Sequence, residues 1–411
     1  MNLDRWLTSK RLRAHGLMLG LAIWSLYVWT LATPTLRDRS GLLKGTDFLH
    51  FYTLGTLAIE HRGRDLYDMS AQAAVAARCV PDAAGIRYLP LYPPQVSLLF
   101  VPLAHLSYGW ALALWWLVCT LLYGVCCYSL WRVCPGLRAC GGTVVALALA
   151  YPAFFNLIAW GQTSALALAC FTGAFLLLRG GREFAAGLVL GCLIFKPQLG
   201  LAVAVVMVAA GAWKIVAVAL LSAAAQVGCG IAYYGVGPLR DWIRNLSNLR
   251  NVIEQFEPRI YQTHSLRTFL SMILPSDRLA FVLYLIGAVV VLWWTVRIWK
   301  RRQSLPLRFS SLLLATVLVS PHLTVYDLVI LAPAFLLLSN WLVTRNSPSS
   351  GFGILLYLAF MLPLLGPFTR WIHVQLSVVV MAALLYWIGR IREEDDSASP
   401  EEIVAAQAAT T

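Results

Sequence analysis

The stretch from Gly41 to Asp68, GLLKGTDFLHFYTLGTLAIEHRGRDLYD, places four carboxylates and two histidines directly after a long apolar segment. A carboxylate at the boundary between water and membrane can accept a proton from a hydroxyl group while that oxygen forms a new bond. Asp47 is our candidate for such a general base. The alternative is structural, because Thr46 or Asp47 begins an apolar run with helical periodicity, where helix-capping residues belong.

Cationic and amide side chains that can bind an anion or a sugar lie farther along the chain. Lys196 interrupts the apolar run GCLIFKPQLG, and a lysine there is costly unless it faces a cavity or reaches the lipid headgroups. His264 and Arg267 share one helical face and can hold a negative charge, or they belong to an amphipathic helix on lipid phosphates. Gln162 follows Gly161 and offers both a donor and an acceptor, so a binding role and a turn role are equally open.

The composition indicates that these groups are carried by a membrane protein. Of 411 residues, 59% are hydrophobic and 12% are charged, whereas soluble domains average about 25% charged residues. Apolar runs near the length of a membrane span recur along the chain. The excess of Lys and Arg, 32 against 19 acidic residues, is typical of cytoplasmic loops and headgroup contacts and does not indicate nucleic-acid binding. The basic N-terminus runs into a first helix that we expect to be retained.

We expect an all-α polytopic membrane protein with about 12 transmembrane helices. The expected spans are 16–33, 109–131, 142–158, 163–179, 184–196, 198–213, 214–232, 278–297, 307–320, 325–343, 352–366 and 371–389. Residues 93–106 are too short for a span, so we expect a membrane-skimming helix. One domain then covers 1–392, with outer loops at 34–108 and 233–277, and 393–411 form a disordered acidic cytoplasmic tail.

The basic residues of the short loops fall on one side of the membrane if both termini are cytoplasmic. With that topology, polar patches far apart in the sequence converge on the extracytoplasmic face of the cytoplasmic (inner) membrane. They are 47–68, YLPLYPPQ (88–95), WGQTS (160–164), FKPQ (195–198), THSLRTFL (263–270) and SPHLTVYD (320–327). Polar groups near lipid are costly and need a reason, so this convergence predicts a functional site.

The order of DFLHFY, LYD, YPPQVSLLFVPL, GQTS, FKPQ and SPHLTVYD resembles glycosyltransferase family 87, which includes polyprenyl-phosphate-mannose-dependent mannosyltransferases. The resemblance covers residues 15–390. It implies a GT-C fold, in which a helical bundle carries a large first extracytoplasmic loop with juxtamembrane helices. It also implies transfer of a sugar from a polyprenyl phosphate with inversion. The family's outer-loop aspartate matches Asp47 through DFLHFY, and its histidine matches His322 through SPH.

The chemistry of such a transfer, rather than the resemblance, gives the other polar residues provisional roles. The donor phosphate and sugar would be bound by Lys196, His264, Arg267, Gln162 and His50. Asp68 and Tyr92 would lie on the acceptor side. Each of these residues also has a structural alternative. His50 and His322 can be ordinary histidines at the membrane boundary, and Asp68 can be a solvated turn residue. Tyr92 can be structural together with Pro93 and Pro94, which fix the entry angle of the helix expected over 93–106. The expected partners are the donor, a lipid or glycan acceptor and membrane lipids. No cofactor is expected, with a divalent metal left open.

Two other functions fit a polytopic membrane protein. A lipid or glycolipid transporter or flippase would hold ionisable groups near the membrane midplane, often in repeated halves, whereas here they gather at one face. An O-antigen-type polymerase or ligase shares the lipid-linked donor, but its large loop comes late in the chain, whereas here the first loop is the largest. Mannose is the favoured sugar, and the acceptor is left open.

Overall fold

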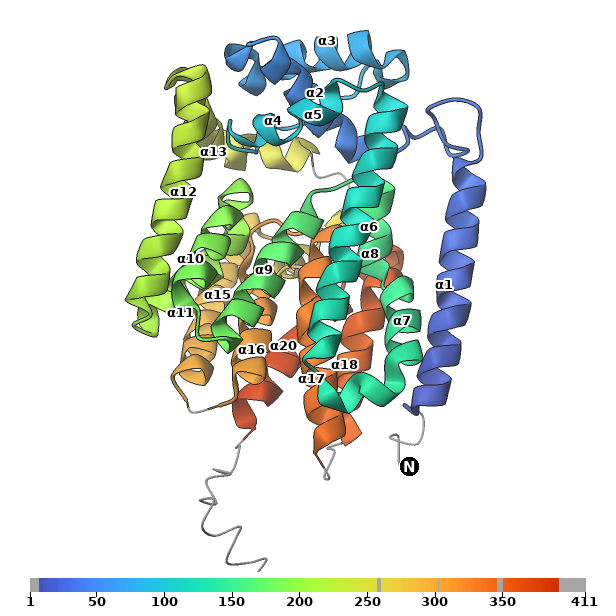
Figure 1. Ribbon diagram of the computed structural model, residues 1–411, viewed down its shortest axis with the longest axis vertical. Helices are drawn as coiled ribbons and strands as arrows, with labels where there is room; N and C mark the ends of the chain where they lie inside the picture. Colours follow the sequence, from blue (N-terminus) through green and yellow to red (C-terminus); the bar gives the residue numbers. More distant parts are fainter. Residues whose placement is uncertain (1–6, 257–259, 302, 346–349, 392–411) are drawn as a thin grey trace, which may run out of the picture.

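The structure, a computed structural model, describes residues 7–256, 260–301, 303–345 and 350–391 and is all-α over these residues. Helices stand side by side in a bundle, and shorter helices cover one end of it (Figure 1). The bundle helices are α1 (Ser9–Leu31), α6 (Tyr108–Arg132), α7 (Gly141–Ala150), α8 (Pro152–Trp160), α9 (Ser164–Arg179), α10 (Glu183–Gly191), α11 (Pro197–Ala209), α12 (Trp213–Tyr234), α15 (Asp277–Lys300), α16 (Leu305–Val319), α17 (Ala332–Thr344), α18 (Ser350–Met361) and α20 (Leu376–Arg390).

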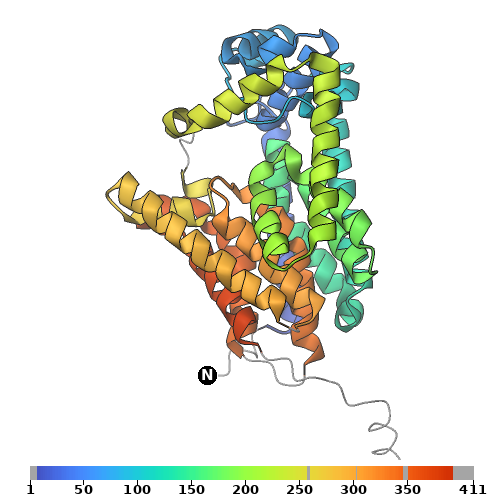
Figure 2. The same cartoon turned by 90° about the vertical axis from the view of Figure 1, so that its left-hand side faces the viewer.

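The cap layer at the upper end consists of α2 (Thr46–Ile59), α3 (Met69–Cys79), α4 (Val96–Leu99), α5 (Val101–Ala104) and α13 (Gly237–Phe256). Figure 2 shows that α13 runs across this end from the top of α12. Two short helices, α14 (Leu266–Ile273) and α19 (Thr369–Ile372), complete the α-helices. The 3₁₀ helices are η2 (Gly63–Tyr67), η3 (Pro81–Ala83), η4 (Pro135–Cys140), η5 (Cys192–Phe195), η6 (Ile260–Gln262), η7 (Val325–Leu331) and η8 (Leu362–Phe368).

Each apolar segment expected as a span is largely helical, although 371–389 is interrupted at 373–375 and 142–158 at Tyr151. Not all of these segments are long enough to cross a membrane alone. Among the described residues, six helices have the required length and apolarity: Ser9–Leu31, Tyr108–Arg132, Trp213–Tyr234, Asp277–Lys300, Val325–Thr344 and Gly351–Ile372. A seventh span results if Pro135–Ala150 and Pro152–Trp160, bent by 44°, are counted together. Helices such as α9 and α11 fall below the usual span of about 20 residues. A multi-pass helical bundle is therefore supported, whereas about 12 spans are not confirmed.

The expected skimming helix over 93–106 is wrong in one respect, because the chain forms two one-turn helices, α4 and α5, that break at Phe100. Pro102 lies in the first turn of α5, where its missing N–H costs nothing, so it favours a new helix start over continuation of α4. Both helices pack on α2. A Cβ atom on Gly55 of α2 would lie 2.6 Å from the Phe100 carbonyl oxygen, so a glycine permits this close contact.

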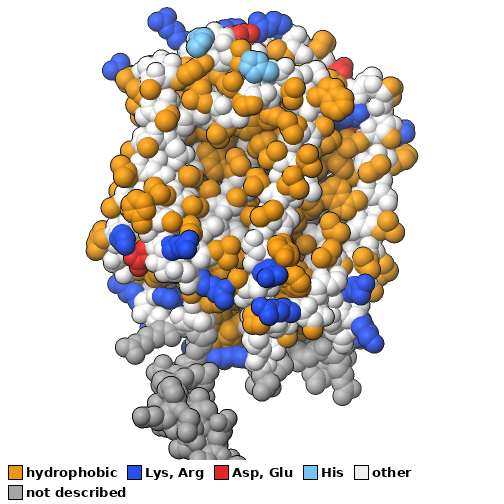
Figure 3. Space-filling view, in the orientation of Figure 1, with side chains coloured by type: hydrophobic (Ala, Val, Ile, Leu, Met, Phe, Trp, Pro, Cys, Tyr) orange, Lys and Arg blue, Asp and Glu red, His pale blue; other side chains and the backbone are white. Residues whose placement is uncertain are grey.

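The outside and the centre of the bundle differ as expected for a protein in lipid. Large apolar side chains are exposed on the outer helices, including Leu21 of α1, Leu220 of α12 and Val289 of α15. Figure 3 shows apolar side chains over the middle of one face, with most Lys and Arg near the lower end and some at the upper end. In contrast, α16 is buried on all sides over 309–319, which fits a central helix that is apolar all round. The predicted tail, 393–411, lies outside the described residues.

Candidate active site

The position of Asp47 is set by the start of α2. Gly45, in the left-handed region with φ 62°, is the residue that caps this helix, and Asp47 lies in its first turn. The Tyr108 hydroxyl of α6 donates to the carbonyl oxygens of Lys44 at 2.8 Å and Gly45 at 2.9 Å, which fixes the α2 start against the bundle. The capping role considered for Thr46 or Asp47 is therefore wrong. The positive end of the helix dipole still favours the negative charge of Asp47.

Gln162 reaches Asp47 because the end of α8 approaches the start of α2 closely. Gly161 ends α8 with φ 70°, and a Cβ atom there would lie 2.6 Å from Cβ of Phe48. No other residue type combines this backbone conformation with this approach at low cost. The next side chain, Gln162, is buried, and its Nε2 donates to Oδ2 of Asp47 at 2.7 Å.

The amide of Gln162 is held from several sides. Its Nε2 also donates to the Tyr326 hydroxyl oxygen at 3.2 Å, and its Oε1 accepts from the Tyr92 hydroxyl at 3.4 Å and the Thr163 backbone N–H at 3.3 Å. These partners come from the loop before α4, from α8–α9 and from η7. An amide with this many partners has one orientation. The structure thus brings Asp47, Gln162 and Tyr92 together.

Lys196 lies in the connection between η5 and α11 and forms a buried ion pair. Its Nζ is 2.6 Å from Oδ1 of Asp327, and each side chain is 4% exposed. Lys196 also donates to Oγ of Ser164 at 3.0 Å, and Ser164 donates to the same Asp327 oxygen. Its Nζ lies 5.3 Å from the centre of the Tyr326 ring, which links the pair to Gln162. The alternative of Lys196 as a headgroup anchor is wrong, because its ammonium group points inward to a carboxylate.

His50 lies one turn after Asp47 on α2 and is enclosed by aromatic rings. Its ring centre is 5.1 Å from that of Tyr88 and 5.8 Å from that of Tyr92. Burial lowers the pKa of His50 to about 4, and the side chain of Gln72 offsets this in part. The ring is therefore neutral at pH 7. Tyr88 donates its hydroxyl to the Thr46 carbonyl oxygen, so it supports both His50 and the start of α2.

His264 and Arg267 hold the loop that carries His322. The backbone N–H of His264 donates to the Leu323 carbonyl at 2.9 Å, and Nη1 of Arg267 donates to the Pro321 carbonyl at 3.2 Å. His264 is fully buried, with Nδ1 2.8 Å from Oγ of Ser377, and burial lowers its pKa to about 3. The neutral ring of His264 is thus part of the packing, whereas Arg267 and His322 are half-buried.

The loop between α16 and η7 connects the ion pair of Lys196 and Asp327 with the segment of His264 and Arg267. His322 is its middle residue. The loop ends at Thr324, whose N–H and hydroxyl both donate to Oδ2 of Asp327 in a reciprocal cap of η7. His322 also interacts electrostatically with Asp327. The ion pair under Gln162 and the loop of His322 are therefore parts of one arrangement.

The other carboxylates of the stretch 41–68 face away from this arrangement. Asp68 is exposed and caps α3, because its Oδ1 accepts from the N–H groups of Ser70 at 2.8 Å and Ala71 at 3.1 Å. Glu60 and Asp65 pair with arginines in the cap layer. Asp68 therefore has a structural role, as the cap of α3. An acceptor contact by this residue stays a prediction.

Sequence reasoning did not name Ser164, Tyr326 or Tyr88 as site residues. For Asp327 it left open a pairing with a cation or a position facing the cavity, and the structure shows the pairing, with Lys196. The signal for Ser164, Tyr326 and Asp327 was present in GQTS and VYD, since polar groups inside apolar segments need partners. Their pairing with Lys196 and Gln162 was not visible, because the partners are far apart in the chain. Among the described residues, no group of three His, Cys, Asp or Glu side chains is placed to hold a metal ion.

A comparison with family models gives a match for this chain. Residues 91–321, more than half of the 411, match glycosyltransferase family 87. This segment contains Gln162, Lys196 and Arg267, ends one residue before His322, and excludes Asp47. Searches of curated proteins and of solved structures found no match. The chain therefore belongs to glycosyltransferase family 87, and it is a membrane glycosyltransferase.

Proposed function

We propose that this protein transfers a hexose, with mannose favoured, from a polyprenyl-phosphate sugar to a hydroxyl group of a lipid or glycan acceptor, with inversion and with Asp47 as the general base. The hydrogen bond between Asp47 and Gln162, at 2.7 Å, carries the proposal. Asp47 lies outside the residues that match the family, and Gln162 lies inside them. Their hydrogen bond connects the candidate base to the segment that matches the family.

The reaction that this site would support forms one bond and breaks one bond. The acceptor oxygen attacks the anomeric carbon, and the bond from that carbon to the phosphate oxygen breaks with its electron pair on the phosphate. The hydroxyl proton passes to the Asp47 carboxylate. Attack from the side opposite the phosphate inverts the anomeric carbon. The leaving phosphate needs positive charge or hydrogen-bond donors close to it.

We assign the role of taking that negative charge to Arg267 and His322, which are half-buried, rather than to Lys196. Lys196 is already neutralised by Asp327 at 2.6 Å. A phosphate that drew the ammonium group away would leave the buried Asp327 carboxylate without its counter-ion, which is costly. We therefore give Lys196 a positioning role, in which it holds Ser164, Asp327 and Tyr326 under Gln162. His50 and His264 support the same geometry as neutral rings.

The charge distribution supports an extracytoplasmic site in the cytoplasmic membrane. Lys and Arg gather near the end of the bundle where α1 starts and α20 ends (Figures 1 and 3). Asp47 and the cap layer lie at the other end. Under the positive-inside rule, the basic end is cytoplasmic. A membrane-borne donor would then meet its acceptor at the outer surface, where a polyprenyl tail can stay in the lipid.

The test is sugar transfer by the full chain reconstituted in liposomes, with polyprenyl-phosphate mannose as donor and membrane lipid extract as acceptor. We expect Asp47→Asn to lower the rate by about 10²- to 10⁴-fold, the usual contribution of a general base. Asp65→Asn is the matched control and should keep the wild-type rate, because Asp65 lies in η2, which packs on α2, and is paired with Arg62. A folded Asp47→Asn protein with the wild-type rate would remove Asp47 from the mechanism.

The sugar is tested separately from the base. If the wild-type protein does not transfer mannose, polyprenyl phosphates carrying arabinose or another sugar are supplied under the same conditions. Transfer of a different sugar that still depends on Asp47 would retain the mechanism and replace mannose as the donor sugar. Failure with every polyprenyl-phosphate donor would contradict the donor class.

A further inference from the structure

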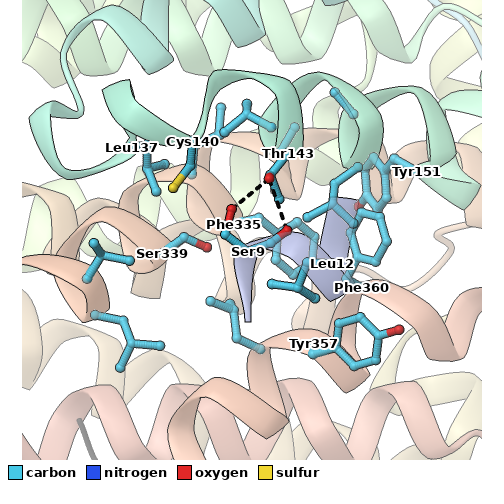
Figure 4. A pocket seen from close by; sticks show the side chains of 18 of the residues that line it. Ser9, Leu12, Leu137, Cys140, Thr143, Tyr151, Phe335, Ser339, Tyr357 and Phe360 are labelled. Atoms are coloured by element: carbon cyan, nitrogen blue, oxygen red, sulfur yellow. Dashed lines mark hydrogen bonds between the residues drawn. The ribbon is translucent and has the colours of Figure 1, made fainter. Parts of the chain in front are cut away.

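A cavity lies in the bundle near its basic end, away from Asp47. It has a volume of about 260 Å³ and is walled by α1, α6, α7, α17 and α18. Figure 4 shows Leu12, Tyr151, Phe335 and Phe360 among the side chains around it. None of the residues of the candidate active site lines this cavity.

Four hydroxyl groups of the cavity wall, those of Ser9, Thr143, Tyr151 and Tyr357, already have partners in the protein. The Thr143 hydroxyl lies 2.8 Å from Oγ of Ser9 and also bonds to the Ser9 carbonyl oxygen, as the dashed lines in Figure 4 show. Tyr151 donates its hydroxyl to the Leu328 carbonyl oxygen at 2.6 Å, and the Tyr357 hydroxyl lies 2.7 Å from Nδ1 of His15. A buried water needs two to four polar partners, and apolar cavities stay dry and take up apolar ligands. The wall therefore favours hydrocarbon over water.

The residues beside this cavity are basic. Ser9 and Leu12 line it, and between and after them in α1 come Lys10, Arg11 and Arg13, all exposed. Arg13 lies over the start of α7, since a Cβ atom on Gly142 would be 3.2 Å from Cζ of Arg13. On the η4 side, the lining residue Leu137 is followed by the exposed Arg138. No lining residue of the described cavity is acidic.

We propose that this cavity is a binding site for an anionic phospholipid of the membrane. One acyl chain would occupy the space between α1, α7, α17 and α18, and the phosphate group would lie beside Arg13 and Arg138. The apolar wall selects a hydrocarbon chain, and the basic rim selects the negative headgroup. This site is separate from the proposed transferase reaction, because it lies at the other end of the bundle and shares none of its residues.

The test is native mass spectrometry of the detergent-purified full chain, titrated with phosphatidylglycerol or with phosphatidylcholine of the same acyl chains. We expect wild-type protein to retain phosphatidylglycerol in preference. Arg13→Gln should weaken its binding about fivefold, the usual effect of one basic residue near an anionic headgroup. Lys214→Gln is the matched control, since Lys214 is exposed at the start of α12 and does not line the cavity.

A second variant tests the acyl-chain part. Ser339→Phe places a bulky side chain in the cavity and should lower the retention of both lipids, whereas Val289→Phe on the exposed face of α15 should leave it unchanged. Arg13→Gln changes only an exposed side chain, so it remains informative if Ser339→Phe fails to fold. Equal retention of the two lipids by the wild type, or equal weakening by Lys214→Gln and Arg13→Gln, would overturn the proposal.

Discussion

Two groups of ion pairs at the same end of the molecule differ in what surrounds them. In the cap layer, Glu60 pairs with Arg62 and Arg78, and these three side chains are 30%, 37% and 54% exposed. Under that layer, Lys196 and Asp327 are 4% exposed. Exposed pairs contribute about 0–1 kcal/mol, because water screens the charges. A buried charge without its partner costs far more. The number of charges in a stretch of sequence is therefore a poor guide to where the site lies.

The sharpest test of this difference is Asp327→Leu. Removal of the carboxylate leaves the buried Lys196 ammonium without a counter-ion, and we expect a loss of about 3–5 kcal/mol in the free energy of unfolding. The double variant Lys196→Met with Asp327→Leu should recover most of that stability. Reversible unfolding in mixed detergent micelles measures both. If the single and double variants were equally stable, the pair would not be coupled as its 2.6 Å contact requires.

Gln162→Met should have the next largest effect, on activity. It keeps the shape of the side chain but removes the hydrogen bond to Asp47, and a hydrogen bond to a charged group contributes about 1.5–3 kcal/mol. We expect transfer to slow by about 10- to 100-fold, at 1.4 kcal/mol per factor of ten. The control is Gln226→Met. Gln226 lies in α12, and its amide donates to the Gly191 carbonyl at the end of α10 and to the Ser222 carbonyl one turn earlier in α12. Equal rates for the two variants would mean that Gln162 does not orient the base.

The buried histidines predict a loss of stability in acid. Burial lowers the pKa of His264 to about 3 and of His50 to about 4, below the ordinary value of about 6.5. Between those values the unfolded chain binds protons that the folded chain does not, so folding is favoured above pH 6.5 and loses about 1.4 kcal/mol per pH unit and per histidine as the pH falls. His264→Gln should flatten this slope in thermal unfolding from pH 7 to pH 4.5. An unchanged slope would show that His264 titrates normally.

The smallest effect is expected for Glu60→Gln, which removes the ion pairs of the cap layer with Arg62 and Arg78. Because the three side chains are solvated, the free energy of unfolding should change by less than about 1 kcal/mol. Transfer activity should stay at the wild-type level. A loss as large as that of Asp327→Leu, in the same unfolding measurement, would break the comparison between the two groups.

Much of the secondary structure could be predicted from local patterns. The apolar segment expected over 109–131 forms α6 (Tyr108–Arg132), and the one expected over 163–179 forms α9 (Ser164–Arg179). The break at Phe100 was missed, because 93–106 is mostly apolar and the position of Pro102 was not used. The number of spans could not be fixed, since a short apolar helix and a span have the same hydrophobicity and differ in packing and tilt.

The sequence by itself determined that the chain is a helical membrane protein of glycosyltransferase family 87, with Asp47 as its candidate base, because apolar runs and the order of polar motifs are local properties of a chain. Only the tertiary structure decided that Gln162 bonds to Asp47, 115 residues away, and that Lys196 pairs with Asp327, 131 residues away. It also showed that Asp47 bonds to Gln162, whereas Asp65 pairs with Arg62 and Asp68 caps α3. Such contacts depend on how helices pack, through the close approach at Gly161 and Phe48, and no periodicity within one helix encodes them.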